Sequence, residues 1–122
     1  MADNSIRWMQ AFFPSAVSLT PATFWQPLAD VYRTHDGWLI KYDLAGVLPE
    51  DVILTVEDSC LTIRGSRRDC CMEEGCCHYR MEISYSHFER TIELPDTLER
   101  ARICTEFRQG MLLVRVQKEA RT

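Results

Sequence analysis

One stretch of the sequence, Val52 to Gly65, restricts the fold more than any other because it has the pattern of two short strands joined by a tight turn. Apolar residues occupy every second position up to Val56, and the polar pair Asp58-Ser59 interrupts them. The alternation resumes at Leu61 and ends at the glycine. This pattern predicts an antiparallel hairpin with one buried face.

The same alternation recurs along most of the chain, separated by turn residues such as His35-Asp-Gly37 and Gln109-Gly110. The further predicted strands are Ala29 to Thr34, Trp38 to Leu44, Tyr79 to Tyr85, Phe88 to Leu94, Ile103 to Phe107 and Leu112 to Val116. About eight short strands in about 90 residues predict an all-β, immunoglobulin-like β-sandwich.

Charge and hydropathy exclude some functions. The formal net charge is -4, which disfavours binding to nucleic acid. No apolar run approaches the roughly 20 residues of a membrane helix, and the first residues lack the pattern of a signal peptide. We therefore expect a cytoplasmic protein without a membrane partner.

The chain divides into an apolar N-terminal arm (residues 1–26), a folded domain (27–118) and a short C-terminal tail (119–122). The prolines of the arm forbid a long helix, so we expect it to be partly disordered, with a short helix at most from Ser5 to Phe13. The arm either packs on its own domain or forms an interaction surface, which is the usual role of an exposed aromatic cluster.

The motifs between the predicted strands resemble those of a known family. They are Pro27 to Val31, Asp43 to Gly46, Leu61 to Arg67, Phe88 to Pro95 and Gly110 to Leu112. In this order and spacing they resemble the α-crystallin domain of bacterial small heat shock proteins, the Hsp20 family. Ala45 and Gln117 stand where the family usually has proline, and the residues after Lys118 hold no Ile-x-Ile/Val motif.

The resemblance implies an ATP-independent chaperone, a holdase, which binds non-native client proteins and uses no cofactor. We expect the clients to contact the aromatic residues of the arm, namely Trp8, Phe12, Phe13, Phe24 and Trp25. The family also has a groove between two strands, which here would involve Val52, Leu54, Val56, Ile103 and Thr105. Val17-Ser-Leu19 is a candidate to fill it, and without the C-terminal motif we expect an assembly smaller than a closed shell.

The resemblance further implies a homodimer in which each chain lends a strand to its partner. The lent strand would be His78 to Ser84 and its acceptor Ala29 to Thr34. Exchange of this kind covers a sheet edge that would otherwise be unpaired. Tyr79, Arg80 and Glu82 are the interface candidates, unless this segment is an ordinary hairpin strand within one chain.

Four cysteines gather in one loop, at Cys70, Cys71, Cys76 and Cys77. They are surface thiols, a redox-sensitive loop whose thiolates Arg67, Arg68 and Arg80 would favour, or a metal site. Adjacent cysteine pairs fit poorly with the spacing of zinc ligands, so we predict no metal. We expect thiols rather than a disulfide framework, with Cys60 and Cys104 as small packed side chains.

No enzyme is predicted, because the sequence shows neither a nucleophile with a base nor a glycine-rich phosphate loop. Two other functions remain open besides the general chaperone. One is an adaptor or co-chaperone that binds one specific partner, and the other is a thiol-based, redox-sensitive variant of the chaperone.

Overall fold

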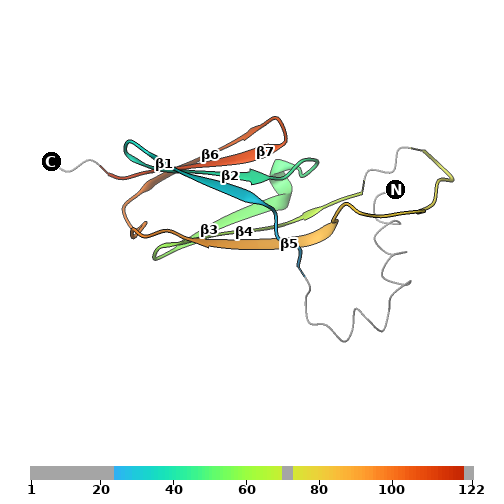
Figure 1. Cartoon of the computed structure of the whole chain (residues 1–122), viewed down its shortest axis with the longest axis horizontal. Coiled ribbons are helices and arrows are strands. Elements are labelled where there is room, and N and C mark those ends of the chain that lie inside the picture. Colours follow the sequence, from blue (N-terminus) through green and yellow to red (C-terminus); the bar gives the residue numbers. More distant parts are fainter. Residues whose placement is uncertain (1–23, 70–72, 120–122) are drawn as a thin grey trace.

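Two antiparallel sheets face each other in the computed structural model, which describes residues 24–69 and 73–119 (Figure 1). The strands are β1 (Ala29–Thr34), β2 (Gly37–Asp43), β3 (Val52–Glu57), β4 (Cys60–Arg67), β5 (Ser86–Glu93), β6 (Arg102–Arg108) and β7 (Met111–Gln117). A short 3-10 helix, η1 (Pro49–Asp51), lies between β2 and β3. The predicted all-β sandwich is confirmed.

The strand order is β1-β2-β7-β6 in the four-stranded sheet and β3-β4-β5 in the three-stranded sheet. The predicted hairpin is present, with Leu54 opposite Ile63 and Val56 opposite Leu61. Asp58 in its turn has a positive φ of 56°, a conformation that short polar residues tolerate. The polar pair therefore makes the turn, and the apolar alternation sets the register.

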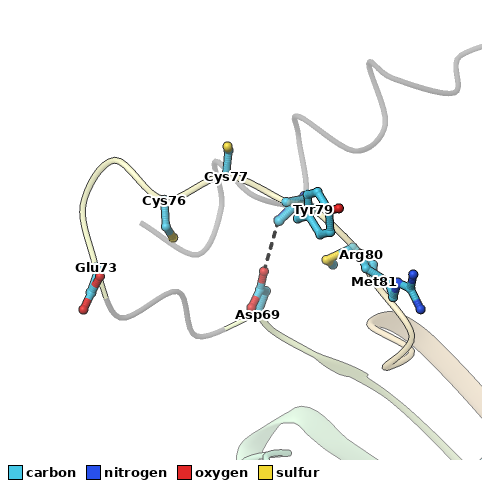
Figure 2. A pocket seen from close by; sticks show the side chains of 8 residues that line it. Asp69, Glu73, Cys76, Cys77, Tyr79, Arg80 and Met81 are labelled. Carbon is cyan, nitrogen blue, oxygen red and sulfur yellow. Dashed lines mark ion pairs between the residues drawn. The ribbon is translucent and has the colours of Figure 1, made fainter.

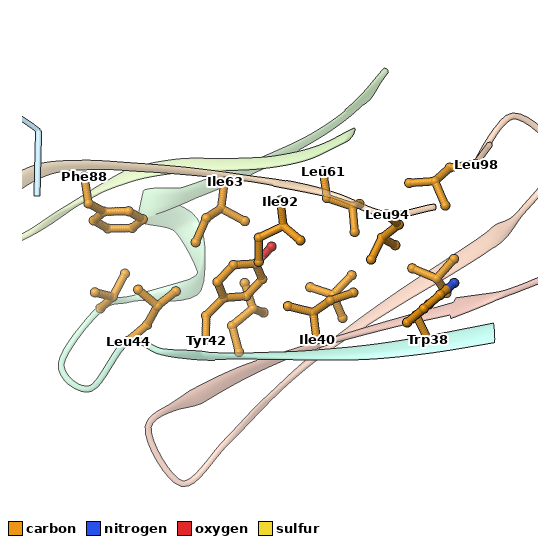
Figure 3. Packing of buried hydrophobic residues seen from close by; sticks show 14 residues of the cluster. Trp38, Ile40, Tyr42, Leu44, Leu61, Ile63, Phe88, Ile92, Leu94 and Leu98 are labelled. Carbon is orange, nitrogen blue, oxygen red and sulfur yellow. The ribbon is translucent and has the colours of Figure 1, made fainter. Parts of the chain in front are cut away.

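The core lies between the inner faces of the two sheets (Figure 3). Ile40 and Tyr42 from β2, Leu61 and Ile63 from β4, and Val114 from β7 are all fully buried. These positions alternate with more exposed ones along each strand, as the period of two requires. The buried residues of this core come from the strands and their connecting loops, and Trp25 packs against them.

One expected strand is absent. The structure forms seven strands in the described residues, and no strand covers the segment from Tyr79 to Tyr85. A strand requires a ladder partner, and this segment has none among residues 24–69 and 73–119. The adjacent strand β5 is already paired with β4 on one side and with Trp25 on the other.

Candidate functional site

Trp25 fastens the end of the arm to the edge of β5. Its backbone amide donates to the carbonyl oxygen of His87 at 3.2 Å, and its own carbonyl accepts from the amide of Glu89 at 3.1 Å. Its indole Nε1 donates to the carbonyl oxygen of Ser86 at 3.2 Å, and its ring centroid lies 5.1 Å from that of Phe88. The arm thus begins as a short parallel addition to β5.

The predicted client residues therefore differ in their surroundings. Trp25 is half-buried, whereas Phe24 is 40% exposed and meets His87 edge to face at a centroid distance of 5.9 Å. Trp8, Phe12 and Phe13 lie outside the described residues, as do Val17 and Leu19. Sequence reasoning treated Phe24 and Trp25 as equivalent, but the hydrogen bonds of Trp25 make it an anchor.

The predicted groove residues lie on the inward-facing rows of β3 and β6, each the last strand of its sheet. On β3, Leu54 lies opposite buried Ile63, and Val56 opposite buried Leu61. On β6, Ile103 and Thr105 lie opposite Val116 and Val114, which are also buried. Val52, Leu54 and Ile103 pack against the core, whereas Val56 is 40% exposed.

Arg90 indicates how the two sheets are aligned. Its Nη1 donates to the carbonyl oxygen of Pro27, just before β1, at 2.8 Å. Strand β5 therefore lies over the β1 side of the four-stranded sheet. Strand β3, at the opposite edge of its own sheet, then lies over the β6 side. The two rows of groove candidates belong to the same side of the sandwich.

The segment predicted to be lent to a partner extends from the domain as an open loop (Figure 2). Tyr79 is 97% exposed and Ile83 61% exposed. Arg80 and Glu82 form an ion pair with an N–O distance of 3.6 Å. The apolar and the charged side chains thus alternate, as they would in a strand with one covered face. Strand β1, the predicted acceptor, is an edge strand of its sheet.

The loop beside this segment surrounds an open cavity of about 560 Å³. Its lining includes Cys76, Cys77 and the ion pair between Asp69 and His78, whose N–O distance is 3.4 Å (Figure 2). Cys77 carries an exposed free thiol, whereas Cys76 is disulfide-bonded. The expectation of thiols is therefore wrong for Cys76. Cys70 and Cys71 lie outside the described residues.

Other cysteine expectations also need correction. Cys104 is exposed and Cys60 only half-buried, because both lie on the outward rows of their strands. Arg68 pairs with Asp51 at 3.1 Å, and its relation to Cys70 and Cys71 lies outside the described residues. No group of three or more His, Cys, Asp and Glu side chains that could hold a metal ion occurs within residues 24–69 and 73–119.

Arg67 makes contacts that the sequence did not indicate. Its guanidinium donates to the carbonyl oxygens of Ser84 and Ala45. It also lies over the ring of Trp25, 4.4 Å from the centroid. The position of Arg67 in the sequence could have indicated such a role. It is the last residue of the motif that begins at Leu61, and it directly precedes the loop between β4 and β5.

Two ionisable groups with perturbed pKa values belong to β2 or contact its start. Burial raises the pKa of Tyr42 to about 12. The pKa of Asp96 is lowered, first by a hydrogen bond from the Trp38 indole at 3.2 Å and then by Lys118. These groups lie on the inner face of β2 and near its start, away from the surfaces described above. No helix in the described part of the chain is long and apolar enough to cross a membrane.

Comparisons with known proteins agree on one family. The pattern described as the Hsp20/alpha crystallin family matches residues 30–122. The chain is 30% identical over 102 residues to an 18 kDa heat shock protein of Streptomyces albus G, covering 79% of this chain and 69% of that protein. It is 26% identical over 93 residues to the small heat shock protein C2 of Rickettsia felis, covering 76% of this chain and 60% of that protein.

The fold is similar to solved structures of the same kind. A small heat-shock protein from Xylella fastidiosa, described as having a distinct high order structure, superposes with a TM-score of 0.65. Its sequence is 26% identical, and the alignment covers 80% of this chain and 90% of that chain.

Proposed function

This chain belongs to the Hsp20/alpha crystallin family of small heat shock proteins, and from that membership we propose that it acts as an ATP-independent holdase. The family implies a chaperone role. The proposal is that the protein binds partly unfolded clients through apolar surface and so lowers the concentration available for aggregation.

One observation in particular supports this proposal: apolar side chains remain at the surface although the core between the sheets is already packed. Leu28, just after the arm, is 75% exposed, and Ile53 on β3 is 63% exposed. Phe24 and Val56 are each 40% exposed. Such residues are available to non-native chains, and the proposed main client surface consists of Trp8, Phe12, Phe13 and Phe24, with Trp25 as its fixed end.

We also propose that the protein is a homodimer in which the segment from His78 to Ser84 adds to strand β1 of the partner. An edge strand with unpaired amides and an extended segment with one apolar row are complementary. Tyr79, Arg80 and Glu82 would then lie at the interface. The groove residues of β3 and β6 are a second proposed binding site, for an extended peptide segment.

The holdase proposal is tested by the ability of the full chain to suppress aggregation of thermally unfolded, unrelated proteins, followed by light scattering. A variant with Trp8→Ser, Phe12→Ser and Phe13→Ser should require about ten-fold more protein for equal protection, because these side chains supply the binding energy. Leu48→Ser is the control, since Leu48 is 47% exposed but belongs to the folded domain and not to the arm.

Equal protection by the triple variant would overturn the assignment of the arm. Protection of a single client with none of the others would instead favour the adaptor function.

The redox-sensitive function is a second candidate, because a disulfide at Cys76 is followed directly by an exposed thiol at Cys77. If it is correct, adding dithiothreitol should change the mass of the particle or its protection of clients. Cys76→Ser should remove this response. An identical mass and identical protection in both conditions would exclude this function.

A further inference from the structure

Arg67 connects two parts of the molecule that lie far apart in the sequence. It is the last residue of β4, and the long loop between β4 and β5 (residues 68–85) begins directly after it. Its Nε donates to the carbonyl oxygen of Ser84 at 2.9 Å, and its Nη2 donates to the same oxygen at 2.7 Å. Its Nη1 donates to the carbonyl oxygen of Ala45 at 3.0 Å. The guanidinium therefore connects the start of this loop, at Arg67, to its end, at Ser84.

The same guanidinium also contacts the C-terminal end of the arm, at Trp25. It lies 4.4 Å from the ring centroid of Trp25 and 5.7 Å from that of Tyr85, both within the range of cation–π attraction. Trp25 is where the arm meets β5, and Tyr85 is where the loop rejoins it. No ring contact joins Trp25 to Tyr85 in the described part of the chain. Arg67 is the side chain that contacts both rings, beside the hydrogen bond from the Trp25 indole to the carbonyl of Ser86.

Lysine would not reproduce these contacts. A guanidinium is a planar fork that can donate in several fixed directions while its face stacks on an aromatic ring, whereas an ammonium is a compact point charge. The partners of Arg67 are carbonyl oxygens and rings, and in residues 24–69 and 73–119 it forms no ion pair. Its role is therefore set by shape and direction more than by charge.

From this geometry we infer that Arg67 is a positioning residue that couples the arm to the loop. Movement of Ser84 and Tyr85 displaces the guanidinium and loosens Trp25, and release of Trp25 loosens the end of the loop. Coupling of this kind is reciprocal. If the proposed strand exchange holds, insertion of the loop into a partner and release of the arm are linked events. That consequence rests on the proposed function, but the coupling itself does not.

The first experiment perturbs the loop at Tyr85 and measures the stability of the backbone pairing at Trp25. Tyr85→Leu in the full chain should speed hydrogen exchange at the amides of Trp25 and Glu89 by about 2- to 5-fold, the value of one exposed cation–π contact. Mass spectrometry of peptides that contain Trp25 or Glu89 at their third position or later measures it. Tyr79→Leu is the matched control, since it makes the same substitution in the same loop at a side chain that is 97% exposed.

The second experiment perturbs Trp25 and measures the mobility of the loop. Trp25→Leu should speed tryptic cleavage after Arg80, whose side chain is 75% exposed, by a similar factor of about 2 to 5. In an Arg67→Lys background, both cross-effects should disappear, because the shared contact is already lost. If Arg67 had a purely structural role, Arg67→Lys would lower the stability of the protein. The effects of Tyr85→Leu and Trp25→Leu would then simply add to that of Arg67→Lys.

Additive effects, or no effect of either ring on the other segment, would overturn the inference. If Arg67→Lys fails to fold, as seen by circular dichroism, the two ring variants alone still decide, because each must alter the other segment. Neither measurement involves a client, so a chain that fails to suppress aggregation leaves this test unaffected.

Discussion

At the scale of single residues, the least expected feature of the core is the hydroxyl of Tyr42. The side chain is fully buried, and the hydroxyl has no hydrogen-bond partner in the part of the chain that the structure describes. A buried polar group without a partner costs about 1 to 3 kcal/mol. Tyr42 therefore fills space between the sheets at an energetic cost.

Removing this hydroxyl should not destabilise the protein. Tyr42→Phe keeps the ring and its packing, so the free energy of unfolding should stay the same or rise by about 1 kcal/mol. Urea unfolding measures the change. Tyr32→Phe is the control, since Tyr32 is 43% exposed and should shift stability by less than about 0.5 kcal/mol. A loss of more than about 1 kcal/mol in Tyr42→Phe would reveal a hydrogen bond to this hydroxyl.

The same residue predicts a dependence on alkaline pH. Burial raises the pKa of Tyr42 from 10.0 to about 12, an effect that Arg90 partly offsets. Below pH 10 the phenol is neutral in both states. As the pH rises from 10 to 12, the unfolded chain loses this proton and the folded chain keeps it, so the free energy of unfolding falls by up to about 2 to 3 kcal/mol.

Unfolding in urea at successive pH values measures this fall. Tyr42→Phe should reduce it, and an identical pH profile in the variant would contradict the assignment.

At the scale of elements, two glycines restrict the chain for different reasons. Gly46 has a positive φ of 84°, which suits glycine in the loop after β2. Gly65 on β4 has an ordinary φ, but a Cβ at this position would collide with the carbonyl oxygen of Asp51 and lie 2.6 Å from Cζ of Phe88. Gly46 is therefore required by its backbone conformation, and Gly65 by the close approach of its neighbours.

Gly65→Ala should therefore destabilise the fold by about 2 to 3 kcal/mol, because η1 and β5 must move apart. Gly75→Ala is a useful control. It has a positive φ of 83° and no neighbour within 4 Å, so it should cost only about 1 to 2 kcal/mol of backbone strain. Thermal unfolding compares them, and a smaller loss for Gly65→Ala than for Gly75→Ala would show that crowding is not the restriction.

At the scale of the whole molecule, the proposed strand exchange makes a prediction about mass. Replacing two residues of the apolar row, Tyr79→Asp and Ile83→Asp, would place charge where the partner's sheet must be dry. The dimer dissociation constant should rise by about ten-fold or more, with an unchanged far-ultraviolet circular dichroism spectrum. Leu48→Asp serves as the control, because it adds charge at an exposed apolar position outside this row.

Analytical ultracentrifugation measures the mass of each variant. If the mass of the double variant equals that of the unmodified chain, the segment from His78 to Ser84 is not the interface.

The sequence by itself determined the strands, the hairpin and the class of fold. Alternation at Val52, Leu54, Leu61 and Ile63 reports which side of a strand is buried, and this information is local. Family motifs in a fixed order identified the domain for the same reason, since each marks a local turn or strand end. Expectations such as the strand from Tyr79 to Tyr85 failed in the single chain because local pattern cannot supply a ladder partner.

Only the tertiary structure decided how Trp25, Arg67 and Cys104 are used. Trp25 is an anchor because β5 has a free edge beside it, and Arg67 meets Ala45 and Ser84 because two loops converge on the end of β4. Cys104 is exposed because its register on β6 points it outward. Each of these outcomes depends on contacts between residues distant in the chain, and such contacts leave no periodic signal in the sequence.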